Sequence, residues 1–351
     1  MNSLKVIDII RSLAPEQYQA DWDNSRIQVC GTRDEVKKIA VTLDPLPSVV
    51  KECLDWGADL VLTHHPLFLK PMAPTEPGQY LDVLRLLVPG GVWMYSAHTS
   101  LDCRPEGPAF WLGSALGLTN TSVIEPVRSF PAREVFFQAP ARITEREARP
   151  MAETPGVLAV SQSAAGEVRV MCEEHAWKEI DELLIAAFGK RPEYFVRRLE
   201  APAITVGYGQ IGELPLAMTY EGFAKLLEKT LFSVQKPFAT TGEAKVKGVA
   251  WAECGPRTDS ICRVAYTTGS GASLIPAAFA AGADVFICGD VKHHPAQETP
   301  GLVFDVGHFI LEEEMMRLFA QEAQSALKEA GGGVEARFFA GRNPFSHRVL
   351  A

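Results

Sequence analysis

The 351-residue sequence predicts an α/β fold in which two related α/β subdomains face each other across a cleft for two metal ions. Three observations support this fold class. Apolar, strand-forming segments alternate with helical ones in both halves of the chain, which is typical of parallel sheets. The segment between the halves has a different pattern and predicts an inserted domain. Six of the eight histidines fall in four short stretches that follow predicted strands.

The first half begins with apolar residues near helical spacing, which predict a surface helix over residues 4–13. A strand is expected over residues 39–43. Ser48 is expected to cap a helix that runs to Trp56, with Gly57 as its stop signal. Further elements are expected at residues 59–63 (strand), 81–87 (helix) and 92–97 (strand). This order predicts a parallel sheet.

The predicted strands of the first half lead directly to histidines. His64 and His65 follow one strand, and His98 follows the next. Ligands of such sheets gather beyond the carboxyl ends of the strands. Neighbouring side chains of an extended backbone point to opposite faces. We therefore expect His64 and His65 to bind two adjacent metal ions, one each.

The second half repeats the order of the first. Strands are expected at residues 262–267, 284–288, 302–306 and 337–340, and helices at 274–281 and 308–330. The triplet Gly57-Ala58-Asp59 has a counterpart in Gly282-Ala283-Asp284, and His64-His65-Pro66 has one in His293-His294-Pro295. The spacing differs by four residues between the halves. The repeat predicts two related halves around one cleft.

Residues 128–201 read strand, helix, strand, strand, helix, strand, which is the order of a ferredoxin-like α+β unit. We expect this segment to be an inserted domain. The metal-binding α/β domain would then be discontinuous and comprise residues 1–127 and 202–351. After the insert, Thr219 is expected to cap a helix that buries Phe223.

Composition excludes several classes of protein. The net charge of -9 disfavours a surface for nucleic acid or anionic membrane. The seven cysteines form no CxxC pair, which predicts reduced thiols and neither a disulfide framework nor a thiolate zinc site. The amino-terminal segment is not typical of a signal peptide, and the most apolar stretch is too interrupted to cross a membrane. A cytoplasmic protein is expected.

The strongest chemical signal is a set of nitrogen and oxygen ligands. His308 and Glu312 are four residues apart on a predicted helix, so they share one face. Alone, this pair is equally consistent with a solvated acidic run, but His64, His65 and Asp102 add to it. We expect His64 and Asp102 on one ion, His65 and His308 on the other, and Glu312 near both. Ligands without sulfur suit zinc, iron, manganese or nickel. Metal-assisted hydrolysis is the reaction class implied.

Other polar residues have less defined roles. His98 and His294 are the candidate catalytic residues, and they and His293 would transfer protons or orient metal ligands. A structural role is the alternative for each. Asp290 is expected either to anchor a ligand histidine or to cap a turn. Residues 267–273, TTGSGAS, are expected between a strand and a helix, as a structural turn or as an anion-binding loop.

The sequence resembles the Nif-three-like family, whose members are named GTP cyclohydrolase I type 2 homologs. The resemblance covers nearly all of the chain outside the insert. The matching stretches are DWDNSRIQV (21–29), GADLVLTHHPLF (57–68), HTSLDC (98–103), GQIGELPLAMTYEGFA (209–224), GSGASLI (269–275), GADVFICGDVKHH (282–294) and VGHFILEE (306–313).

The resemblance implies two α/β subdomains around a di-metal site, assembly into toroidal homohexamers, and an insert similar to the PII-like and CutA-like trimeric proteins. The ligand positions of the family correspond to all five expected ligands, which are His64, His65, Asp102, His308 and Glu312. The sequence departs from the family pattern at residues 24–26, Asn-Ser-Arg, where small residues are usual after the asparagine.

Two functions remain open on the sequence. The first is a di-metal hydrolase of a small nucleotide-like or pterin-like molecule, as the cyclohydrolase name implies. The alternative is a non-catalytic metal-binding, metal-trafficking or regulatory assembly. A ring that binds nucleic acid is disfavoured by the acidic charge.

Overall fold

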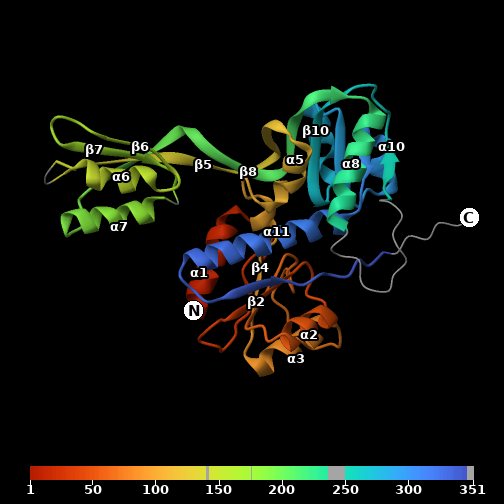
Figure 1. The fold of residues 1–351 in the computed structure, drawn as a ribbon, viewed down its shortest axis with the longest axis horizontal. Coiled ribbons are helices and arrows are strands. Elements are labelled where there is room, and N and C mark those ends of the chain that lie inside the picture. The colour runs from red at the N-terminus through yellow and green to blue at the C-terminus, as the bar shows by residue number, and fades with distance from the viewer. Residues whose placement is uncertain (140–141, 175, 236–249, 346–351) are drawn as a thin grey trace, which may run out of the picture. The chain divides into compact units, whose positions relative to one another are not determined.

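The structure, a computed structural model, describes residues 1–139, 142–174, 176–235 and 250–345. It is a mixed α/β fold with two sheets (Figure 1). The chain divides into two compact units, one formed by Met1–Val127 with Gly207–Ala351 and the other by Arg128–Val206. Short 3-10 turns lie at Glu16–Tyr18, Val88–Gly90, Pro108–Phe110 and Ala272–Leu274.

The first sheet belongs wholly to the larger unit and has the order β1-β4-β3-β2-β13. Its strands are β1 (Ile27–Val29), β2 (Lys38–Thr42), β3 (Leu60–Thr63), β4 (Trp93–Ser96) and β13 (Glu335–Phe338). All neighbours pair in parallel except β1, which is antiparallel to β4. The parallel strands therefore end at one edge, where β3 and β4 deliver the histidines that follow them.

Alternate residues of these strands pack on opposite faces of the sheet. One face packs with α2 (Pro47–Asp55) and α3 (Gln79–Leu87). The other face packs with α1 (Ser3–Leu13) and the long helix α11 (His308–Glu329). The strands are apolar at nearly every position because both faces are covered.

The larger unit also contains the strand series β8-β10-β11-β12-β9 of the second sheet. Its strands are β8 (Phe195–Met218), β9 (Ala252–Cys254), β10 (Ile261–Ser270), β11 (Val285–Gly289) and β12 (Leu302–Asp305), and β10, β11 and β12 are parallel. The associated helices are α8 (Tyr220–Gln235), α9 (Ile275–Ala280) and α10 (His293–Glu298). Thr219 precedes α8 and caps it, because its Oγ1 accepts a hydrogen bond from Gly222 N–H at 3.2 Å.

Helix α11 packs against strands of both sheets, β2 and β13 from the first and β10 from the second (Figure 1). It is therefore buried on more than one side, and three consecutive carboxylates, Glu312, Glu313 and Glu314, are all buried. Buried carboxylates need partners. Glu314 pairs with Arg317, and Glu313 accepts a hydrogen bond from Gly341 N–H at 2.6 Å. Glu312 points to the histidines. The short helices α4 (Thr99–Asp102) and α5 (Trp111–Leu116) complete the unit.

The repeated Gly-Ala-Asp triplets have the same structural role in both halves. Asp59 Oδ2 accepts the backbone N–H groups of Lys37 and Lys38 at 2.8 and 3.0 Å. Asp284 Oδ2 accepts those of Cys262 and Arg263 at 2.8 and 2.7 Å. Each aspartate thus ties the start of its strand to the start of the neighbouring parallel strand. The repeat in the sequence is a repeat of this contact.

The smaller unit has the chain order β5, α6, β6, β7, α7, β8 and the strand order β6-β7-β5-β8. Its elements are β5 (Thr119–Gln138), α6 (Glu145–Glu153), β6 (Val157–Gln162), β7 (Glu167–Cys172) and α7 (Trp177–Phe188). Val168, Val170 and Ile180 lie in its own hydrophobic core. The residues of this core all belong to the smaller unit, so the unit has a hydrophobic core of its own.

Three sequence expectations differ from the structure. Ser48 does not cap α2, because Pro47 occupies the first helical position and Leu46 is the capping residue. Strands β5 and β8 extend beyond the expected insert, residues 128–201, at its beginning and its end. Strand β10 continues to Ser270, so most of the TTGSGAS segment is strand, and the following helix α9 has only six residues.

Two further features concern the cysteines and the apolar character of the helices. The cysteines are free thiols, and Cys53, Cys103, Cys172 and Cys288 are buried. Among the described residues, no helix combines the length and the apolar character that crossing a bilayer requires.

We predict that replacing Asp59 by alanine lowers the free energy of unfolding by about 2 kcal/mol, because two backbone N–H groups and Arg33 lose a charged acceptor. Burial opposes ionisation of Asp59, but these donors outweigh it and lower its pKa. The contribution is therefore complete above the unfolded pKa of about 4 and is lost as the pH falls through the lower pKa that Asp59 has in the folded protein. Urea unfolding at neutral and acidic pH measures both effects.

The matched control is Asp55→Ala, which removes an exposed carboxylate paired with Lys51 on the same helix. It should change stability by less than about 0.5 kcal/mol. Equal effects of the two substitutions, or a loss from Asp59→Ala that is the same size at neutral and acidic pH, would contradict the proposed role of the Asp59 carboxylate.

Candidate metal centre

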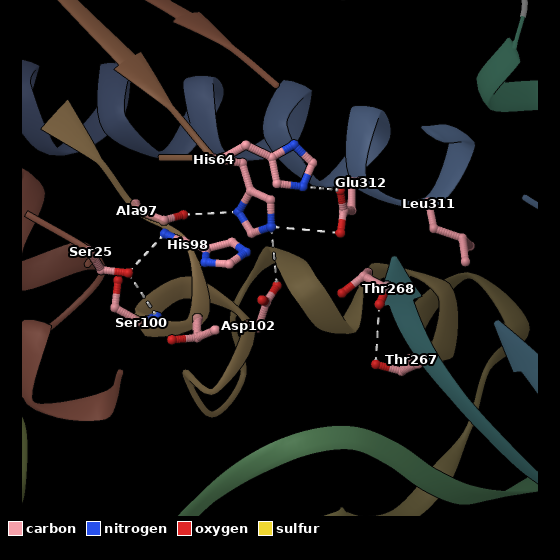
Figure 2. A network of polar contacts seen from close by, with 12 residues as sticks. Ser25, His64, Ala97, His98, Ser100, Asp102, Thr267, Thr268, Leu311 and Glu312 are labelled. Carbon is pink, nitrogen blue, oxygen red and sulfur yellow. Dashed lines mark hydrogen bonds and ion pairs between the residues drawn. The ribbon is translucent and has the colours of Figure 1, made fainter. Parts of the chain in front are cut away.

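The centre is assembled from chain segments that follow the carboxyl ends of parallel strands. His64 and His65 follow β3, and His98 follows β4 by two residues. His308 is the first residue of α11, after β12, and Glu312 lies one turn further along the same helix. Asp102 ends the short helix α4. Figure 2 shows His64, His98, Asp102 and Glu312 converging on one region.

Each imidazole is held through its Nδ1 atom by an oxygen acceptor. His64 Nδ1 lies 2.9 Å from the carbonyl oxygen of Ala97. The other three rings are held by carboxylates, at 2.7 Å for His65 with Asp44, 2.8 Å for His98 with Asp23 and 2.7 Å for His308 with Asp290. A carboxylate or carbonyl partner on the second ring nitrogen is the usual arrangement of metal-binding histidines. Nε2 is therefore left for binding in each ring.

The two carboxylate oxygens of Glu312 face different histidines. Oε1 lies 3.7 Å from His64 Nε2, and Oε2 lies 3.2 Å from His65 Nε2 and 2.7 Å from His308 Nε2. Asp102 Oδ1 lies 3.6 Å from His64 Nε2. The contacts thus divide into a His64 and Asp102 side and a His65 and His308 side, with Glu312 between them.

The separations of 3.2–3.7 Å fit metal ions between the donors, whereas the 2.7 Å between His308 Nε2 and Glu312 Oε2 is a direct hydrogen bond that an ion would replace. Nitrogen and oxygen ligands lie about 2.0–2.2 Å from zinc, so two ligands of one ion stand roughly 3–3.5 Å apart. His64 Nε2 and Asp102 Oδ1 are both buried, and neither has a hydrogen-bond partner. Unpartnered buried polar atoms are costly. A cation between these two atoms would satisfy both, and the His65, His308 and Glu312 donor atoms form a second group of matching chemistry.

A glycine makes room beside these donors. A side-chain carbon added to Gly269 would lie 2.0 Å from Glu312 Oε1 and 3.3 Å from His308 Nε2. Gly269 also has a φ of +65°, which favours glycine. It belongs to the β10 end that includes Thr268, which faces the same region in Figure 2. The TTGSGAS segment thus contributes to the centre the space that Gly269 leaves beside Glu312. Its anion-binding alternative stays a prediction.

Strong mutual electrostatic effects act inside the centre. Burial alone would lower the pKa of His65, but Asp44 and Glu312 outweigh it and raise the pKa to about 10. Burial is likewise outweighed at His308, where Glu312 raises the pKa to about 9. Burial would raise the pKa of Glu312, yet the surrounding imidazoles hold it well below its usual range. Without metal, protons on the histidines balance the buried carboxylates.

The structure brings together the five expected ligands, His64, His65, Asp102, His308 and Glu312, and places His98 beside them. His294 is exposed on α10 with its ring against His293, and neither belongs to the donor groups found among the described residues. The second half contributes His308 to these groups, and a role of His294 in proton transfer or ligand orientation stays a prediction.

Two functional aspartates were not singled out from the sequence. Asp44 follows the end of β2 and holds His65, and Asp23 precedes β1 and holds His98. The position of Asp44 just beyond a parallel strand was a usable signal. Asp290, for which two roles were open, anchors His308 from a backbone with a φ of 61°, which is uncommon outside glycine.

Known proteins are similar to this chain in sequence. The family model described as Duf34/NIF3 (NGG1p interacting factor 3) matches residues 1–344. A Mycobacterium tuberculosis protein called GTP cyclohydrolase 1 type 2 homolog is 28% identical, over 88% of this chain and 87% of its own length. A Bacillus subtilis protein of the same name is 25% identical, over 88% of each chain.

Two solved structures show the same fold. A Bacillus cereus protein related to NIF3 superimposes with a TM-score of 0.79 and 22% identity, over 100% of this chain and 99% of the other. The Staphylococcus aureus protein SA1388 gives a TM-score of 0.68 and 21% identity, over 99% of each chain. At these identities the likeness establishes the fold, including its two sheets.

We predict that Gly269→Ala lowers metal content by displacing Glu312, since the added carbon would overlap its Oε1 atom. Elemental analysis of protein dialysed against limiting zinc measures the effect. The control is Gly331→Ala, which has the same kind of backbone, with a φ of +73°, but nothing within 4 Å of the added carbon. The control should retain wild-type metal content. Equal metal content in both variants would contradict the role of this space.

We predict that metal binding at pH 7.5 releases at least about two protons, because His65 and His308 must lose theirs before Nε2 can coordinate. The affinity for metal should therefore fall as the pH is lowered. The number of protons released on metal binding should diminish above pH ~10. Titration calorimetry in buffers of different ionisation enthalpy counts the protons. Heats that do not depend on the buffer would show that these imidazoles are already neutral.

Proposed function

Because the chain belongs to the Duf34/NIF3 family, whose relatives carry the name GTP cyclohydrolase 1 type 2 homolog, we propose that it is a di-metal-dependent hydrolase of a small nucleotide-like or pterin-like molecule. The observation that supports this most is the division of the Glu312 oxygens between two sets of donors. A carboxylate shared in this way suits two neighbouring ions.

The residues that would hold the ions are His64 and Asp102 on one side and His65 and His308 on the other, with Glu312 between them. Divalent ions there would polarise a carbonyl, imine or phosphoryl oxygen and lower the pKa of a coordinated water. The donor atoms are nitrogen and oxygen, which suits zinc, iron, manganese or nickel.

The chain itself would contribute orientation and shielding. Asp44 and Asp290 fix the rings of His65 and His308, so these imidazoles need not reorganise when they bind. The Glu312 side chain is only 6% exposed and that of His64 is fully buried, so most water is excluded from this part of the centre. A dry, pre-oriented site strengthens electrostatic stabilisation of developing charge.

We also propose that the smaller unit is a ferredoxin-like insert of the PII-like and CutA-like kind. Its β-α-β-β-α-β chain order and its strand order β6-β7-β5-β8 support this. The toroidal homohexamer that the family resemblance implies stays a prediction, which light scattering of the purified protein would test.

We predict that Glu312→Gln loses both ions, because the substitution removes the negative charge that faces both sets of imidazoles. Wild-type protein, purified without oxygen and without chelators, should contain two ions per chain. The control is Glu313→Gln on the same helix; Glu313 is equally buried and directed at Gly341 N–H, so this variant should keep both ions.

Turnover is then assayed on metal-loaded wild type and both variants with GTP, other nucleotides, pterins and phosphodiesters. The proposal expects hydrolysis by wild type and Glu313→Gln, and loss of at least about 100-fold in Glu312→Gln. Stoichiometric metal in the wild type with no turnover of any compound would contradict the hydrolase and favour a non-catalytic metal-binding assembly.

A further inference from the structure

His98 and Asp102 form a second pair with the spacing of His308 and Glu312. Asp102 N–H donates to the carbonyl oxygen of His98 at 3.2 Å, so the two residues lie one helical turn apart at α4. His308 and Glu312 lie one turn apart at the start of α11. Each pair follows a strand of a different sheet, β4 for His98 and β12 for His308. The two sheets thus present equivalent histidine–carboxylate pairs to the centre.

The ring of His98 is fixed as firmly as those of the expected ligands. Asp23, whose side chain has no exposed surface, holds His98 Nδ1 at 2.8 Å. Its other oxygen accepts hydrogen bonds from Ser25 Oγ at 2.6 Å and from Thr99 N–H at 3.1 Å. A buried carboxylate with this many donors has one orientation. The same type of contact, from Asp290, fixes His308.

His98 is also close enough to share a metal ion. The donor nitrogens of His64, His65 and His98 all lie within 4.8 Å of one another. The His98 ring lies nearer to His64 than to His65, with centroid distances of 5.1 and 5.7 Å. His64 Nε2 is fully buried and has no hydrogen-bond partner. Figure 2 shows the rings of His64 and His98 beside Asp102.

We propose that His98 is a sixth protein ligand of the metal centre, bound to the ion that His64 and Asp102 hold, and that Asp23 is its positioning residue. This inference rests on the proposed metal centre. It gives each ion two imidazoles, His64 with His98 and His65 with His308, and the shared carboxylate of Glu312. Without His98, the first ion would have a single imidazole from the chain.

The test uses full-length protein with His98→Ala, Asp23→Asn and, as a control, His293→Ala, which removes an exposed histidine outside the donor groups. Zinc affinity at each site is measured by competition with a chromogenic chelator, and stoichiometry by elemental analysis. The visible spectrum of cobalt-substituted protein reports the ligands directly. Thermal unfolding of metal-free protein verifies that each variant folds.

His98→Ala is expected to lower the affinity for one of the two ions by about 100-fold, to leave the affinity for the other unchanged and to alter the cobalt spectrum. Asp23→Asn keeps the imidazole of His98 but no longer fixes its orientation, so the affinity for one ion should fall by about 10- to 100-fold. Two ions of wild-type affinity and an unchanged cobalt spectrum in both variants would overturn the inference and leave the proposed function standing. A wild type that takes up no metal would overturn both.

Discussion

The carboxylate of Glu312, buried and facing imidazoles on both of its oxygens, is the contact on which the centre depends. A buried charge is costly unless it is paired and hydrogen-bonded. The pairing requires α11 to lie between the two sheets, because His64 and His65 come from the first sheet while His308 is on the helix itself. Contacts along α11 set its position. Trp111 Nε1–H donates to the carbonyl oxygen of Leu311 at 2.9 Å, and Arg104 binds Glu322 through two nitrogens.

The second constraint is the set of aspartates behind the histidines. Asp23, Asp44 and Asp290 come from different loops, and each holds one Nδ1 atom. The rings are therefore oriented before any ion arrives, which reduces the reorganisation that binding would require. Glu312, together with Asp44 at His65 and Asp290 at His308, raises the pKa of these two imidazoles, so protons and metal ions compete for them. In this protein, orientation and charge balance come from the same contacts.

Much of this architecture could be predicted from local pattern. Apolar runs such as β11 are continuous because both faces are buried, and histidines beyond their carboxyl ends indicate a site. The lengths of β5 and β8 could not be predicted, because these strands are largely exposed and lack a continuous apolar run. Asp23 and Asp44 were missed since aspartates are common in loops, and only three-dimensional proximity distinguishes an anchor. The sequence could not show which histidine of the second half joins the donor groups: His308 does, whereas the exposed His294 does not.

The central claim is that two ions lie on either side of the Glu312 carboxylate. Anomalous diffraction from crystals grown with zinc, recorded on both sides of the zinc absorption edge, tests it most directly. The account predicts two anomalous peaks per chain, one between His64 and Asp102 and one between His65 and His308, each within about 2.2 Å of a Glu312 oxygen. A single peak, or peaks remote from Glu312, would contradict it.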